Sequence, residues 1–238
     1  MDHRDHVALI RDGVVGGGPR WIELGAGDGA FTLALADLLG ERGEIVAVDR
    51  DPRALATLGE RLAGAFPAVS VRTVAADFRA GLPPGRFDGV LAANSLHFVD
   101  DPVPVLRSAA GALAPGGRVV VVEYDADRGN PWVPHPFSAA RFPELAAAAG
   151  LPAVQPLGRV PSRFLGAIWS AAAWPEPGAT GNAGAAGAAG GAGEPAGTGD
   201  AGTTGEPGEP GGTGDAGTTG EPGEPVVHSA PHGDDREE

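Results

Sequence analysis

The 238-residue chain contains no cysteine and no lysine. Without cysteine it has no disulfide, no thiolate nucleophile and no thiolate metal ligand, and the absence of lysine removes lysine from the catalytic candidates. No apolar run approaches membrane-spanning length, and no apolar segment of signal-peptide length follows the charged first residues. We therefore expect a soluble cytoplasmic protein that has no membrane partner.

Large apolar side chains are missing from the C-terminal part of the chain. From Pro175 onward there is no Leu, Ile, Met, Phe, Tyr or Trp, and such a segment cannot bury a core of its own. We expect one folded domain over residues 1–174 and a low-complexity, acidic, Gly/Pro-rich tail over residues 175–238. The net charge of −14 divides into about −3 for the body and −11 for the tail, which argues against nucleic-acid binding.

The tail has a collagen-like repeat. Glycine begins 15 of the 16 triplets between Gly178 and Gly223, and residues 197–210 recur as residues 212–225. A trimerising triple helix and a disordered, extended tail are the two alternatives. Proline is sparse, no basic residue pairs with the acids, and Ala196 interrupts the glycines, so we favour the disordered tail. We expect a monomer or weak oligomer and not a tail-driven trimer.

The chain is organised around the stretch from Arg20 to Gly29, RWIELGAGDG. It is typical of a short buried strand that breaks into a glycine loop and then opens a helix. Gly25 and Gly27 permit backbone angles that a side chain forbids, and they let a ligand approach the main chain. Because free N–H groups at a helix start favour polar or anionic groups, we expect a nucleotide-like cofactor here. A glycine-rich turn without a ligand is the alternative, since the loose dinucleotide pattern completed by Ala30 is weak evidence.

Strand-like and helix-like segments alternate along the body. Periodicity predicts helices over residues 6–15, 30–40, 52–63, 102–113 and 138–150, and strands over residues 20–24, 43–49, 69–74, 87–94, 118–124, 153–160 and 164–172. The valine run in segment 118–124 is typical of a central strand covered on both faces. The alternation predicts a parallel, doubly wound sheet, and the short link over residues 161–163 requires the last two strands to pair antiparallel. The expected fold class is a Rossmann-like α/β sheet of seven strands, mostly parallel, with a C-terminal antiparallel pair.

Acidic side chains end the first two strands. Glu23 ends the first strand, and Asp49 ends the second, 20 positions beyond Gly29. Both should reach the carboxyl edge of the sheet, where this architecture binds ligands, and a carboxylate there can accept both hydroxyls of a ribose. The alternative for Asp49 is a solvated acid that caps the next helix.

Several motifs together resemble those of class I S-adenosylmethionine-dependent methyltransferases. They occur in family order and spacing over about residues 1–172. They are Glu23-Leu24-Gly25-Ala26-Gly27-Asp28-Gly29, Asp49, Ala76-Asp77-Phe78, the strand from Asp88 to Asn94, and Leu113-Ala114-Pro115-Gly116-Gly117. The closing antiparallel pair is also similar to that family. Within it, Asn94-Ser95-Leu96-His97-Phe98 resembles the small ubiquinone/menaquinone-biosynthesis branch (methyltransferase type 11/25-like).

The resemblance implies a role for each motif in binding S-adenosyl-L-methionine. The loop Gly25, Ala26, Gly27, Asp28 and Gly29 would pass under the methionine part, with Glu23 near its amino group.

At the adenosine part, Asp49 would hold the ribose hydroxyls and Arg50 would pack along the adenine. Asp77 would accept from the adenine amino group with Phe78 beside it, and Asn94 would line the methyl-transfer end.

His97 is the candidate general base, because it follows the fourth strand at the ligand edge and its pKa is in the useful range. A histidine that packs at the strand end is the alternative. Glu123 and Tyr124 end the fifth strand, either beside the site or as a polar pair bracing the next loop. Trp132 and His135 line the acceptor pocket or anchor that loop.

No metal site is expected. His3 and His6 lie in what we expect to be a frayed N-terminus with no third ligand nearby. The pair Asp100-Asp101 is better explained by helix capping.

Three functions remain open at this stage. A methyltransferase acting on a small-molecule acceptor is favoured. A nicotinamide-dependent oxidoreductase has no evident second half-site and no catalytic Tyr/Lys pair. A non-catalytic cofactor-binding or scaffold protein assembled through the tail is the third. The sequence does not define the chemical class of the acceptor.

Overall fold

The computed structural model describes residues 1–162 and 164–176. The predicted collagen-like tail beyond residue 176 lies outside the described residues. The helices are α1 (His3–Val14), α2 (Ala30–Leu39), α3 (Pro52–Ala65), α4 (Val103–Gly111) and α5 (Phe142–Ala148), with short 3-10 turns η1 (Gly40–Arg42), η2 (Phe78–Ala80) and η3 (Leu96–Phe98). The strands are β1 (Arg20–Leu24), β2 (Glu44–Asp49), β3 (Ser70–Ala75), β4 (Phe87–Ala93), β5 (Leu113–Tyr124), β6 (Ala153–Ser162) and β7 (Gly166–Trp174).

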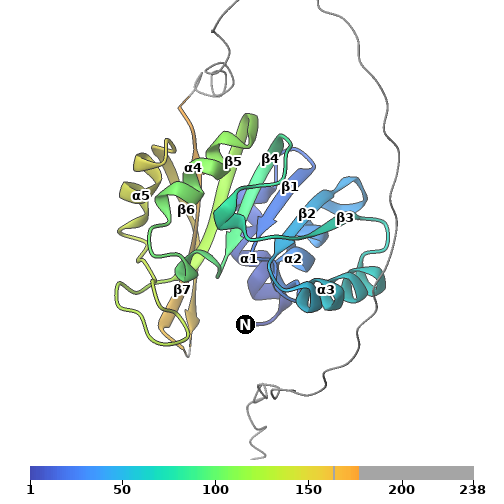
Figure 1. The fold of residues 1–238 in the computed structure, drawn as a ribbon, viewed down its shortest axis with the longest axis horizontal. Helices are drawn as coiled ribbons and strands as arrows, with labels where there is room; N and C mark the ends of the chain where they lie inside the picture. The colour runs from blue at the N-terminus through green and yellow to red at the C-terminus, as the bar shows by residue number, and fades with distance from the viewer. Residues whose placement is uncertain (163, 177–238) are drawn as a thin grey trace, which may run out of the picture. The chain divides into compact units, whose positions relative to one another are not determined.

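The seven strands form one sheet in the order β3-β2-β1-β4-β5-β7-β6 (Figure 1). Strands β1 to β5 pair in parallel, β7 runs antiparallel to β5, and β6 runs antiparallel to β7. The predicted doubly wound sheet with its closing antiparallel pair is confirmed. The strand order reverses between β1 and β4, and in such sheets the ligand crevice opens at the carboxyl ends of the strands beside this point.

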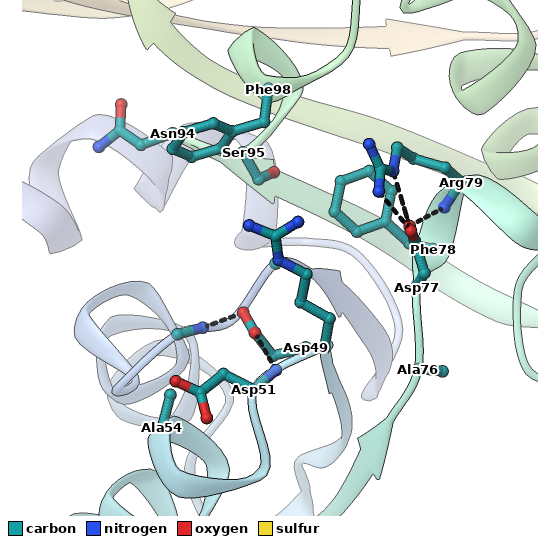
Figure 2. A pocket seen from close by; sticks show the side chains of 13 residues that line it. Asp49, Asp51, Ala54, Ala76, Asp77, Phe78, Arg79, Asn94, Ser95 and Phe98 are labelled. Atoms are coloured by element: carbon teal, nitrogen blue, oxygen red, sulfur yellow. Dashed lines mark hydrogen bonds and ion pairs between the residues drawn. The ribbon is translucent and has the colours of Figure 1, made fainter. Parts of the chain in front are cut away.

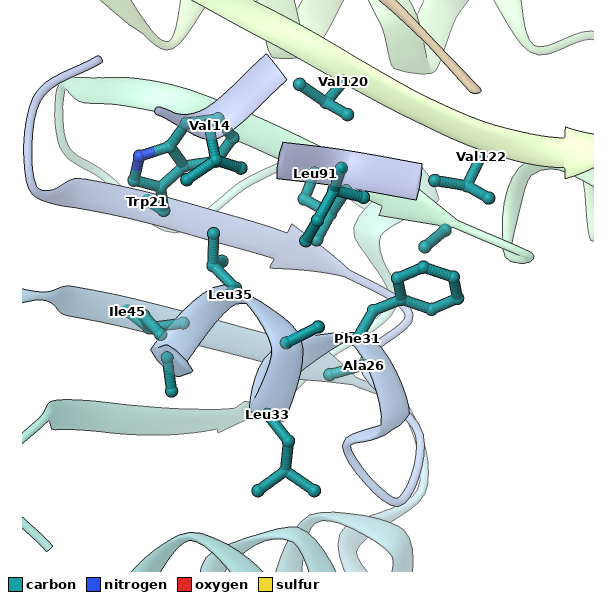
Figure 3. Close-up of a cluster of buried hydrophobic side chains, with 14 of the residues drawn as sticks. Val14, Trp21, Ala26, Phe31, Leu33, Leu35, Ile45, Leu91, Val120 and Val122 are labelled. Carbon is teal, nitrogen blue, oxygen red and sulfur yellow. The ribbon is translucent and has the colours of Figure 1, made fainter. Parts of the chain in front are cut away.

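Helices cover both faces of the sheet, as the alternation of side chains along each strand requires. Trp21 and Leu91 face the layer made by α1, α2 and α3, where they pack with Leu35 and Phe31 (Figure 3). The neighbouring residue Ile22 faces the opposite layer, built on α4 and α5. Burying these two apolar layers supplies the main favourable term in the stability of the body.

The valine run of β5 is buried on both faces. Residues 119–122 are all 0% exposed, and they alternate between the two core layers. This confirms the predicted central strand. The strand begins earlier than residue 118, at Leu113, because the Pro-Gly-Gly segment stays alongside β4 with an irregular register between Phe87 and Gly89.

Two helices begin at residues other than those predicted. The N-terminus is not frayed: α1 begins at His3, because Asp2 and Asp5 form a reciprocal capping box. The helix expected from residue 138 begins only at Phe142. The N–H groups of Ser138 and Ala139 donate to aspartate side chains of the preceding loop, which holds that stretch outside the helix. Within the described part of the chain, no helix has both the length and the apolar character needed to cross a bilayer.

A substitution at Gly89 tests the packing of β4 on β1. A Cβ at Gly89 would meet the ring of Trp21 at 2.4 Å, and Trp21 is fully buried. We expect Gly89→Ala to lower the free energy of unfolding by about 1–3 kcal/mol, the usual cost of overpacking. Gly59→Ala is the matched control, since no atom lies within 4 Å of a Cβ there and alanine favours the interior of α3. Urea unfolding that ranks the two variants equally would contradict this packing.

Candidate functional site

A cavity of about 410 Å³ opens at the carboxyl ends of β1, β2, β3 and β4 (Figure 2). The predicted site residues that line it are Gly25, Gly27, Asp49, Arg50, Asp77, Phe78 and Asn94. The cavity is also lined by six residues to which sequence reasoning gave no site role: Asp51, Ala54, Ala76, Arg79, Ser95 and Phe98. The remaining predicted residues, Glu23, Ala26, Asp28, Gly29 and His97, are not among those that line it.

The glycine loop after β1 adopts the left-handed backbone that its sequence permits. The φ angles of Gly25, Gly27 and Gly29 are 75°, 54° and 94°, which favour glycine over any residue with a Cβ. A Cβ at Gly25 would lie 2.5 Å from the Cβ of Ser95, whereas the position above Gly27 is open space. The loop therefore leaves its main chain accessible on the cavity side.

Asp49 ties this loop to the end of β2. Its Oδ2 accepts a hydrogen bond from the N–H of Gly27 at 2.8 Å, and its Oδ1 accepts from the N–H of Asp51 at 2.9 Å. Each carboxylate oxygen has more than one lone pair, so both oxygens can still accept from a ligand. This geometry fits two adjacent hydroxyls such as those of a ribose.

Asp77 lies at the other end of the cavity, where Arg79 engages it closely. The guanidinium Nε lies 2.9 Å from Oδ1 and 3.0 Å from Oδ2, and the N–H of Arg79 also donates to Oδ1. These bonds lower the pKa of Asp77 to about 2. To accept from the adenine amino group as predicted, Asp77 must share or release part of this contact, because both of its oxygens already accept from Arg79.

Glu23 is buried beneath the cavity rather than on its wall. It is 1% exposed, and its Oε2 accepts from the hydroxyl of Thr32, a residue of α2, at 2.5 Å. Burial raises the pKa of Glu23 to about 8, with a smaller contribution from the charge of Asp49. At neutral pH the side chain is therefore mainly protonated and neutral, and its predicted contact with a methionine amino group stays a prediction.

His97 pairs with Glu123, and both side chains are buried. The Nδ1 of His97 lies 2.8 Å from Oε2 of Glu123, and the N–H of His97 donates to Oε1 at 3.1 Å. The pair joins η3, which follows β4, to the end of β5. A carboxylate on Nδ1 favours the tautomer that keeps the lone pair on Nε2. His97 as the general base stays a prediction.

Aromatic side chains extend from the cavity across the carboxyl edge of the sheet. Phe98 lines the cavity, and its ring lies 4.3 Å from that of His97. The His97 ring lies 5.7 Å from Tyr124, Tyr124 lies 5.8 Å from Phe164, and Phe164 lies 6.0 Å from Trp132. Phe98, Phe164 and Trp132 are 53%, 46% and 69% exposed. We call the five side chains of Phe98, His97, Tyr124, Phe164 and Trp132 the aromatic row.

The loop after β5 also holds His135, whose Nδ1 lies 3.5 Å from the carboxylate of Asp100. Asp101 accepts from the N–H of Val103 just before α4, whereas the N-cap residue of that helix is Pro102. Over residues 1–162 and 164–176, no three His, Asp or Glu side chains gather in a way that could hold a metal ion.

Some of the six additional lining residues had partial signals in the sequence. Ala76, Ser95 and Phe98 lie inside motifs already noted for Asp77 and Asn94. Asp51 directly precedes the helix predicted from residue 52, and in the structure it caps α3. Arg79 carried no signal, because its contact with Asp77 depends on the turn of η2.

Several methyltransferases have sequences or structures similar to this chain. A family model described as a methyltransferase domain matches residues 22–119. The ubiquinone/menaquinone biosynthesis C-methyltransferase UbiE of Azotobacter vinelandii is 34% identical over 108 residues, which are 45% of this chain and 43% of that protein. The chain spans about half the length of the curated relatives it matches.

Two solved structures share the fold. The S-adenosylmethionine-dependent methyltransferase SibL in its apo form is 28% identical, with a TM-score of 0.55 over 71% of this chain and 54% of that chain. The N-methyltransferase NodS from Bradyrhizobium japonicum WM9 is 22% identical, with a TM-score of 0.57 over 73% of this chain and 96% of that chain.

The raised pKa of Glu23 predicts a pH dependence of stability. The unfolded chain releases this proton near the ordinary value of 4.5, whereas the folded protein holds it to about pH 8. The contribution of Glu23 to the free energy of unfolding therefore falls by several kcal/mol between pH 4.5 and 8 and is constant above pH 8. In Glu23→Gln this fall should be absent, as measured by urea unfolding across that range.

Glu144→Gln removes an exposed carboxyl of α5 and is the control. Its free energy of unfolding should fall with pH as much as that of the parent protein. If the free energy of unfolding of Glu23→Gln changed with pH in the same way as that of the parent protein, Glu23 would be shown to ionise normally in the folded state.

Proposed function

We propose that this chain, which matches a methyltransferase-domain model over residues 22–119 and resembles S-adenosylmethionine-dependent methyltransferases, transfers the methyl group of S-adenosyl-L-methionine to a small-molecule acceptor. The observation that carries this proposal is the cavity at the switch point of the sheet, where an open glycine loop and the carboxylate of Asp49 line one wall. The size of the cavity, about 410 Å³, falls in the range of small-molecule sites.

The residues of the cavity fit this cofactor. The open space over Gly27 admits a ligand directly onto the main chain, and Asp49 offers two oxygens for the ribose hydroxyls. Phe78 supplies an apolar surface beside Asp77, while Arg50 lines the same cavity. We assign the adenosine part to Asp49, Arg50, Asp77 and Phe78, and the methionine part to the glycine loop.

Methyl transfer depends mainly on how the protein positions the two reactants. The bound cofactor supplies a sulfonium-activated methyl group, which an acceptor takes by in-line displacement. Holding two reactants at attack distance can account for about 7–11 kcal/mol of a barrier. Asn94 and Phe98, at the end of β4 and in η3, border the side of the cavity from which an acceptor would approach. Where the acceptor carries a proton that must leave, we propose His97, oriented by Glu123, as the base, although its buried side chain does not itself line the cavity.

We further propose that the acceptor carries a flat ring. The aromatic row begins at the cofactor cavity with Phe98 and ends at Trp132, and three of its members are strongly exposed. Aromatic faces pack well against planar rings, and Phe164 and Trp132 form an exposed aromatic pair of the kind found at binding surfaces. Curated relatives named as ubiquinone/menaquinone biosynthesis C-methyltransferases support a ring-bearing acceptor.

Calorimetry with S-adenosylhomocysteine tests the cofactor assignment. We expect saturable binding, and Asp49→Asn should weaken it at least about tenfold, since hydrogen bonds to a charged acceptor are worth about 1.5–3 kcal/mol. Asp12→Asn removes an exposed carboxylate of α1 and should leave the affinity unchanged. Absence of heat with the parent protein, or a shift of NAD(P)H fluorescence on mixing, would favour a different function.

The acceptor surface can be tested with labelled methyl donor and a panel of hydroquinones and naphthoquinols. For any member that is methylated, Trp132→Ala should lower kcat/KM several-fold while the affinity for S-adenosylhomocysteine stays constant. Val15→Ala changes an exposed apolar residue at the end of α1 and is the control. Equal rates for Trp132→Ala and the control would place acceptor binding elsewhere.

A further inference from the structure

We infer that Ser95 recognises the amino-acid end of the methyl donor, its hydroxyl accepting a hydrogen bond from the donor's ammonium group. The inference rests on the proposed function, because it takes S-adenosyl-L-methionine as the ligand of the cavity. Neither the family motifs nor the relatives assign a ligand contact to Ser95.

The first observation is an unpaired hydroxyl on the cavity wall. Ser95 is 3% exposed and lines the cavity. Its Oγ is buried and has no hydrogen-bond partner within the described part of the protein. The Oδ1 of Asn94 is also buried and has no hydrogen-bond partner there. Buried polar atoms are nearly always paired, so two unpaired oxygens on successive residues of one cavity wall indicate that a ligand supplies the partner.

The second observation is the position of Ser95 over the glycine loop. The site of a Cβ on Gly25 lies 3.3 Å from Oγ of Ser95. The hydroxyl is therefore close to the main chain that carries the methionine part in the proposed complex. Figure 2 shows the Ser95 hydroxyl directed into the space bordered by Phe98 and Phe78.

The third observation is the backbone that holds these two residues. Asn94 has a φ of 51° and is the one non-glycine residue with positive φ in the described ranges. Its N–H donates to the carbonyl of Val122 at 2.8 Å, which fixes the turn at the end of β4. Left-handed backbone at a residue other than glycine carries strain, and such strain gathers at ligand sites.

The chemistry of the two oxygens selects the ligand group. An amide Oδ1 accepts only, and a serine hydroxyl can accept while its own proton is free to rotate. An acceptor on the cavity wall suits a group that carries N–H donors, and an ammonium has three. The donor has such groups at both ends, the ammonium of its amino-acid half and the amino group of its adenine. Ser95 lies against Gly25 of the loop to which we assign the methionine part, and this position selects the ammonium.

The test compares two ligands that differ in the amino-acid half. Calorimetry is done with S-adenosylhomocysteine and with 5′-deoxy-5′-methylthioadenosine, which keeps the adenosine and lacks the amino acid. In Ser95→Ala, the affinity for S-adenosylhomocysteine should fall about tenfold or more, the usual effect of losing a hydrogen bond to a charged group. The affinity for methylthioadenosine should change by less than about twofold, because that ligand lacks the ammonium partner.

The melting temperature of the variant distinguishes a role of Ser95 in ligand recognition from a role in the stability of the fold. Removing a hydroxyl that has no partner should leave the melting temperature of the ligand-free protein equal or higher. Ser170→Ala is the matched control, since that buried hydroxyl donates to the carbonyl of Leu9 at 2.6 Å. It should lower the melting temperature and leave both affinities unchanged.

A second measurement needs no variant. The parent protein should bind an S-adenosylhomocysteine analogue whose ammonium is replaced by hydrogen about tenfold more weakly than S-adenosylhomocysteine. Equal affinities here, or equal losses for both ligands in Ser95→Ala, would overturn the inference. Failure of the parent protein to bind S-adenosylhomocysteine at all would instead overturn the proposed function.

Discussion

The hydrogen bond from the N–H of Gly27 to Asp49 Oδ2 fixes the geometry on which the whole site depends. It joins the loop after β1 to the end of β2, so the glycine bend and the carboxylate keep one spacing. The N–H groups of Gly25 and Ala26 also donate to the carbonyl of Val48, which locks the loop against the same strand. A ligand that touches both the loop and the carboxylate meets a surface already in place, and such preorganisation lowers the cost of binding.

The side-chain alternation of the strands explains why acids at similar positions have different environments. Glu23 points toward α2 and becomes fully buried, and this burial raises its pKa although the hydrogen bond from Thr32 acts in the opposite direction. Glu123 ends β5 on the other side of the switch point and engages His97. Asp49 lies at the last position of β2, where the sheet ends, and it reaches the cavity. Strand position and sheet face together determine which carboxylates can meet a ligand.

Much of the fold could be predicted from the sequence, because its signals are local. The alternation of apolar strands and amphipathic helices, the glycines at 25, 27 and 29, and the valines of β5 each reflect backbone or burial constraints. The motifs also indicated Asp49, Asp77 and Asn94 for the site. The contact of Arg79 with Asp77, the burial of Glu23 and the aromatic row could not be predicted. Each depends on distances between segments that are separate in the sequence or on the exact turn that follows a strand.

The central claim is that the loop and the carboxylate of Asp49 bind one cofactor together. The most direct measurement is a crystal structure of the protein with S-adenosylhomocysteine. The account predicts both ribose hydroxyls within hydrogen-bond distance of the Asp49 carboxylate, with the homocysteine part lying along Gly25 and Gly27. A structure in which this ligand occupies another surface, or in which Asp49 faces away from it, would contradict the account.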